Sequence, residues 1–166
     1  MATSKWAAVV SALYDVLGAT SGYRKAEDYG TGIPVFLGPD IGAHEMDASS
    51  WLTIAWAGTP DSPESPGGIQ QEVAGMAASD RPRDETGTIR CRACCQLGDI
   101  SLMDALEAAQ TLMATVETAI RTDPYVGLGA ASNLRWAQTQ SGEAMWDLTD
   151  GAVAWWTFEL TYKARL

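Results

Sequence analysis

Histidine and cysteine are scarce in this sequence, and basic residues are few. The 166-residue chain has one histidine, three cysteines and 11 lysines and arginines. A single histidine argues against a Ser–His–Asp triad, and the chain has neither a Gly-x-Ser-x-Gly elbow nor a Gly-Lys-Ser/Thr phosphate loop. The Gly127-Leu128-Gly129 segment lacks the third glycine of a dinucleotide-binding loop. We therefore expect a protein that is not an enzyme and has no cofactor and no metal ion.

The few residues that could bind a metal do not form a ligand set. His44 stands beside acidic residues in a segment typical of a solvated loop. Cys91 and Cys94 have the Cys-x-x-Cys spacing of zinc and redox sites, but they fall in an alternating strand pattern without a second ligand pair. Cys94 and Cys95 are strand neighbours that point to opposite faces, which makes them poor disulfide partners. We expect three reduced structural thiols, with a zinc site at Cys91 and Cys94 as the alternative.

The charge balance and the lack of long apolar runs exclude two kinds of partner. The chain has 21 acidic residues against 11 basic ones, which gives a net charge of −10. Tight binding to the DNA backbone needs clustered lysine and arginine, so we expect none, although DNA could pass beside an acidic wall without sticking. No apolar run approaches the roughly 20 residues of a membrane-spanning helix, so we expect no membrane partner.

Hydrophobic periodicity predicts two helices and several strands. One helix is expected over residues 5–17, and a second begins at Ser101, which has Asp104 three residues on as a capping partner, and ends before Pro124. The clearest strand is the last segment, where apolar and polar residues alternate from Ala152 to Leu166. Further strands are expected over residues 33–37, 51–57, 86–97 and 134–139.

Turn-forming residues separate these elements. Prolines and glycines among acids and serines predict a flexible loop over about residues 58–68, and the charged residues 81–85 predict a turn. Ser141-Gly142 predicts another turn. With the length of one domain, residues 1–166 are expected to form a single α+β domain, in which two helices cover a mainly antiparallel sheet.

Strand-face polarity selects candidates for an interface between subunits or with partners. Trp155 and Trp156 point to opposite faces of one strand, so Trp155 either lies under a loop or meets a partner subunit. Arg90 and Arg92 share the polar face of their strand and could pair with acids of a neighbouring subunit, or simply be exposed. The candidate interface residues are Arg81, Arg83, Asp84, Glu85, Arg90, Arg92 and Trp155.

Three passages in order along the chain carry a family resemblance. They are the segment from Arg83 to Cys91, Arg121-Thr122-Asp123-Pro124 after the long helix, and Tyr162-Lys163-Ala164-Arg165-Leu166 at the end. With a helix at the start, the sequence resembles the tail terminator (tail-completion) proteins of long-tailed bacteriophages and prophages of actinobacteria. The resemblance spans nearly the whole chain, but the acidic, proline-rich loop around residues 58–68 has no counterpart in it.

The resemblance implies a fold, a location and partners. The fold would be related to that of the tail-tube family, and the protein would be a virion component at the junction of tail and neck, assembled in the host cytoplasm. It would form a homohexameric ring on the major tail tube protein, stop tube polymerisation and offer a docking surface to the head-completion (stopper) connector, while genome DNA passes through the lumen. The alternatives are the tube protein itself or a stopper ring protein. The family has no catalytic residues.

Overall fold

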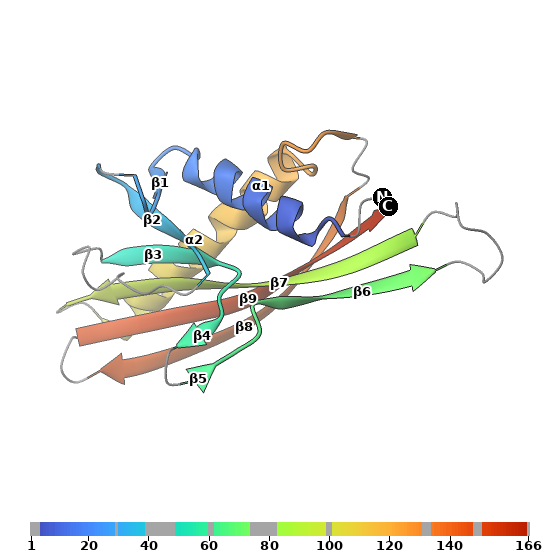
Figure 1. Ribbon diagram of the computed structural model, residues 1–166. Helices are drawn as coiled ribbons and strands as arrows, with labels where there is room; N and C mark the ends of the chain where they lie inside the picture. The colour runs from blue at the N-terminus through green and yellow to red at the C-terminus, as the bar shows by residue number, and fades with distance from the viewer. Residues whose placement is uncertain are drawn as a thin grey trace.

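Two helices lie on one face of a curled, mixed β-sheet in the computed structural model (Figure 1). The structure describes residues 4–28, 30–38, 49–59, 62–73, 83–98, 101–130, 134–147 and 151–165. The α+β class is thus confirmed. The helices are α1 (Trp6–Gly18) and α2 (Leu102–Thr122). The strands are β1 (Tyr23–Lys25), β2 (Ile33–Leu37), β3 (Ser50–Ile54), β4 (Gly58–Thr59), β5 (Ser62–Pro63), β6 (Gly67–Val73), β7 (Arg83–Leu97), β8 (Arg135–Asp147) and β9 (Gly151–Arg165).

The sheet combines a parallel part with an antiparallel part. Its strand order is β1-β2-β3-β7-β9-β8, in which β1–β2 and β2–β3 are parallel and the remaining pairs are antiparallel. β9 covers one side of β7 along nearly its whole length, and the other side is shared by β6 and β3. Backbone hydrogen bonds also occupy the gap along β7 between these two strands. The Trp56 backbone amide donates to the Arg90 carbonyl at 2.8 Å, and the Arg90 backbone amide donates to the Pro66 carbonyl at 3.0 Å.

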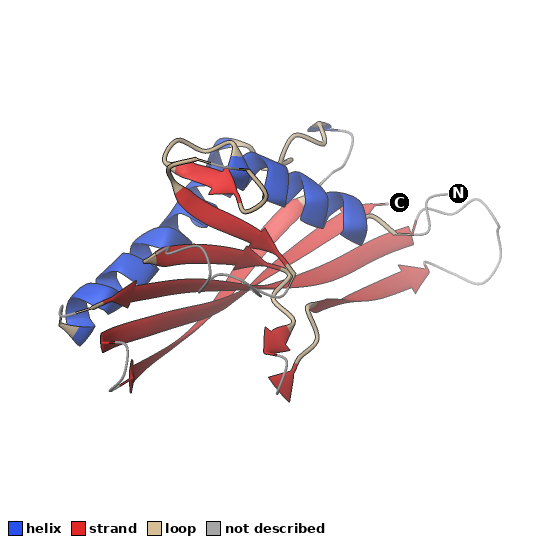
Figure 2. Ribbon diagram, turned by 60° about the vertical axis from the view of Figure 1, so that its left-hand side comes forward, coloured by secondary structure: helices blue, strands red, loops and turns tan. Residues whose placement is uncertain are grey.

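The apolar faces of both helices pack on one side of the sheet. Ser101 caps α2 as expected, since its hydroxyl accepts a hydrogen bond from the Asp104 amide at 3.3 Å. The helix ends at Thr122, before Pro124. The main core joins both helices to the facing side chains of the long strands; its fully buried members include Val9, Leu13, Leu17, Leu52, Ile89, Val116 and Tyr162. Figure 2 shows both helices on this side, and the β4–β5 hairpin beyond the opposite side.

The long terminal strand is confirmed, and three expectations about loops and turns are corrected. Part of the 58–68 segment is ordered: it contains the β4–β5 hairpin and the start of β6. Ser141-Gly142 lies inside β8, because β9 provides a partner for every residue of that strand. The expected strand 51–57 ends at Ile54, since Ala55 takes a left-handed conformation with φ of 55°.

The charged turn expected over residues 81–85 is also corrected. Arg83, Asp84 and Glu85 form the start of β7 and pair with both β6 and β9. Arg81 lies outside the described residues. The neighbouring strands supply the backbone hydrogen bonds that a turn would have left to water, so long-range pairing overrides the local preference.

Candidate functional site

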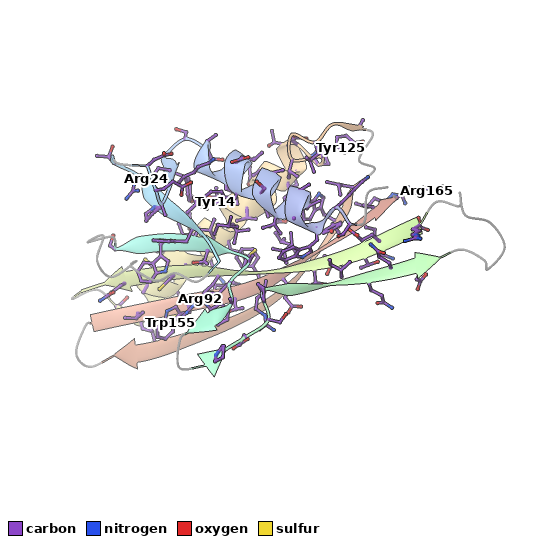
Figure 3. All side chains as sticks on the ribbon, in the orientation of Figure 1. Tyr14, Arg24, Arg92, Tyr125, Trp155 and Arg165 are labelled. Carbon is purple, nitrogen blue, oxygen red and sulfur yellow. The ribbon has the colours of Figure 1, made fainter. Side chains whose placement is uncertain are left out.

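The face of the sheet opposite the helices carries three of the candidate interface residues. The guanidinium carbon of Arg92 lies 4.9 Å from the ring centre of Trp56 and 5.0 Å from that of Trp155. Figure 3 shows Arg92 and Trp155 together on this side. Trp155 is half-buried and also packs against a small apolar cluster that contains Trp51 and Cys94. Arg92 thus links two tryptophans within one chain, where each cation–π contact contributes about 0.5–2 kcal/mol.

Arg90, on the same face, forms ion pairs within the chain. One guanidinium nitrogen bonds to Glu64, which follows the β4–β5 hairpin, and the other lies 3.4 Å from Glu159 of β9. The Glu64 amide also donates to the Ala57 carbonyl at 2.8 Å. These contacts hold the segment after the hairpin against the sheet. The side chains are partly exposed, so the ion pairs contribute at most about 1 kcal/mol to folding.

Glu85 is a buried anion on the helix-covered face and is 0% exposed. Its carboxylate accepts hydrogen bonds from the Tyr162 hydroxyl at 2.6 Å, the Gln71 amide at 2.9 Å and the Lys5 backbone amide at 3.0 Å. Burial by itself raises the pKa of Glu85, but these bonds together with one from Ser4 outweigh burial and hold that pKa below its ordinary value. The carboxylate therefore joins the start of α1 to three strands rather than facing a partner.

A charged cavity of about 640 Å³ opens at the end of the sheet where β7 begins and β9 ends. The residues that line it on β6 and β7 include Glu72, Asp84 and Thr86, and those on β8 and β9 include Arg135, Lys163 and Arg165. Strand pairing sets Asp84 opposite Arg165, and Arg83 is exposed beside them.

The sequence prediction did not include the three basic residues that line this cavity. The alternation of the last strand does place Lys163 and Arg165 on its polar face. Arg135 could not be added without the register of β8 on β9.

The three cysteines are buried free thiols. Cys94 packs in the apolar cluster on the face opposite the helices, and Cys95 packs against α2 on the other face, which confirms that these neighbours point to opposite sides. Burial raises the pKa of the Cys91 thiol to about 12. Among the described residues no three histidine, cysteine or acidic side chains gather as metal ligands. His44 lies outside the described residues.

Besides the three-residue edge strand β1, two longer strands in the described part of the chain offer an edge for further pairing. In the part of the chain that the structure describes, β6 pairs with β7 alone and β8 pairs with β9 alone. Unpaired backbone groups at such an edge can accept a strand from another chain. The edge strand β6 also carries Ile69, whose side chain is 49% exposed. The molecule thus presents two long edges of different sequence.

Comparisons with known proteins assign no family. No protein-family model matches the chain, and no curated protein matches its sequence. Neither helix in the described part of the chain combines the length and apolar character needed to cross a membrane.

Proposed function

We propose that this chain is a tail terminator of a long-tailed bacteriophage, a structural protein that forms a ring on the head-proximal end of the tail tube. In this proposal the sheet is a variant of the tail-tube fold whose working part is the antiparallel set β6, β7, β9 and β8. The protein acts through its surfaces and has no reaction chemistry.

The observation that carries the proposal is the pair of unlike sheet edges, β6 and β8. A ring requires a heterologous interface, in which one surface of a subunit meets a different surface of the next. Edges of different length and sequence meet this requirement, because β6 of one subunit can approach β8 of its neighbour without two-fold symmetry. The exposed Ile69 adds apolar surface to that contact.

A terminator must also bind unlike partners above and below the ring. One surface has to match the tube, whereas the other has to reject a further tube ring and accept the head connector. The sheet here has one face covered by the helices and an opposite face without helices, and the latter carries Arg90, Arg92 and Trp155. These two chemically different faces suit two different partners, although Arg90 and Arg92 already have contacts within the chain.

Electron microscopy of virions from a phage that lacks this chain tests the proposal. We expect overlong tails, or tails that fail to join heads. Normal tails on normal heads would overturn it. The purified protein provides a second test, because a terminator should stop at a closed ring or remain monomeric, whereas a tube protein should grow into long filaments. Particles with finished tails but empty, leaking heads would instead indicate a stopper ring protein.

A further inference from the structure

The basic and acidic residues of this chain are separated along its longest strands. Lys5, Arg83, Arg135, Lys163 and Arg165, five of the 11 basic residues, lie at the end of the sheet where β7 and β8 begin and β9 finishes; we call this the basic end. Lys5 belongs to it because its ammonium group bonds to the Arg165 carbonyl at 2.8 Å. The acidic residues Glu72, Asp84 and the buried Glu85 also lie there, so basic residues prevail locally in a chain of net charge −10.

The opposite end of the sheet has the reverse character. Residues 93–120 contain neither lysine nor arginine, and the first half of α2 within this range carries the acidic residues Asp104 and Glu107. The first half of α2 packs against the last residues of β7 and the first of β9, which places the exposed Asp104 and Glu107 at this opposite end. Ala154 and Lys163 are nine positions apart along β9, a span of about 30 Å, which is several times the Debye length of about 8 Å at physiological salt. The two ends therefore act as separate charged surfaces.

The basic end contains a pairing that opposes folding. Lys163 lies directly opposite Arg135 in the β8–β9 ladder, and both side chains are exposed. Like charges in directly opposed positions are destabilising. Asp84 lies opposite Arg165 instead, two residues further along β9. An external anion placed beside Lys163 and Arg135 would relieve their repulsion, and the cavity that both residues line is open to such a group.

We propose, on the basis of the self-assembly proposed above, that the basic end docks on the acidic end of a second copy of this chain. Lys163 and Arg135 would form ion pairs with carboxylates in the first half of α2 of the next subunit. These carboxylates belong to Glu107 and Asp104. A second copy of this chain is the partner we expect, because the chain provides the complementary acidic surface at the other end of the same strands. Contacts of this kind are heterologous, so the end-to-end contact is an alternative to the β6–β8 edge contact as the interface that closes the ring. They should weaken as salt rises.

Sedimentation velocity of the purified chain at about 50 and about 500 mM NaCl tests this contact, since the Debye length shortens strongly over that range. We expect assemblies that dissociate as salt rises. Lys163→Gln should weaken self-association at low salt by roughly three-fold or more, a change within the range of a partly exposed ion pair. Ser11→Glu, at an exposed position of α1, changes the net charge by the same amount and should leave assembly unchanged.

A charge exchange identifies the partner surface. Lys163→Glu and Glu107→Lys should each assemble poorly alone, because each sets like charges against each other, whereas a mixture of the two should assemble as the wild type does. Failure of the mixture to recover, wild-type assembly by Lys163→Gln, or a monomer at every salt concentration would overturn the proposal. Wild-type self-association by Lys163→Gln, together with lost binding to a short DNA duplex, would assign the basic end to nucleic acid instead. The virion experiment above is independent of these outcomes, because it tests the terminator role without reference to this contact.

Discussion

Tyr162 donates a 2.6 Å hydrogen bond to the carboxylate of Glu85, and both side chains are completely buried. The contact joins β9 to β7 beneath the start of α1, where Lys5 donates to the same carboxylate. Gly87 makes room for the arrangement, since its Cα hydrogen faces the Tyr162 ring and any Cβ there would overlap it. The two ends of the described chain are therefore fixed to one another around a single buried charge (Figure 1).

Replacing Tyr162 by phenylalanine should lower the free energy of unfolding by about 1.5–3 kcal/mol, because a buried carboxylate loses one of its donors. Urea denaturation monitored by far-UV circular dichroism measures the change. Tyr23→Phe is the matched control, as the Tyr23 hydroxyl bonds to the neutral hydroxyl of Thr115 at 2.8 Å and its loss should cost only about 0.5–1.5 kcal/mol. Equal losses in the two variants would contradict a special role for the charged pair.

Acid should destabilise the protein in part through Glu85. Its pKa in the folded chain lies below the ordinary value of 4.5, because the hydrogen bonds it accepts outweigh the effect of burial. As the pH falls, the unfolded chain binds the proton first, so the contribution is complete above about pH 4.5 and is lost as the pH falls through the folded pKa. Urea midpoints recorded from neutral pH to about pH 3 should fall more steeply for the wild type than for Glu85→Gln. Parallel curves would show that this carboxylate is not linked to stability.

Gly87→Ala should destabilise the sheet by about 1–3 kcal/mol or more, because the new methyl group forces the Tyr162 ring away from its position and from Glu85. Gly68→Ala is the control on the adjacent strand β6, where an added Cβ meets no atom within 4 Å. That variant should be neutral or slightly more stable. Thermal unfolding measures both, and similar melting temperatures would contradict the packing of Tyr162 over Gly87.

The sequence predicts those elements of the fold whose signal is local. The two-residue period of the last strand, the capping of α2 by Ser101 and the end of that helix before Pro124 were all correct. The charged segment that includes Glu85 was wrongly expected to be a turn, because the partners that bury it, Gln71 and Tyr162, lie 14 and 77 positions away. A pattern read from one sequence cannot reveal hydrogen-bond partners that lie so far apart along the chain.

The candidate surface was predicted only in part for the same reason. Strand alternation correctly placed Arg90 and Arg92 on one face of their strand, and Trp155 on the opposite face of another strand from Trp156, but only the pairing of β7 with β9 brings the three to one face of the sheet. It could not show that Arg92 stacks on Trp56, a residue 36 positions earlier, or that Arg90 is paired with Glu64. The basic end is formed where the start of β7, the start of β8 and the end of β9 meet, and these segments come together only in the folded sheet.

The open edge at β6 gives a direct test of ring formation through unlike sheet edges. Ile69→Lys should leave the subunit folded but weaken its self-association, because a charged side chain on an edge strand opposes pairing with another chain. Leu37→Lys is the matched control: Leu37 is 47% exposed, against 49% for Ile69, and ends the interior strand β2. Circular dichroism should show both variants folded, and sedimentation velocity should show a smaller assembly for Ile69→Lys alone. If instead Leu37→Lys dissociates the assembly and Ile69→Lys does not, subunits meet through the β1–β3 side of the sheet and the β6 edge is not the contact.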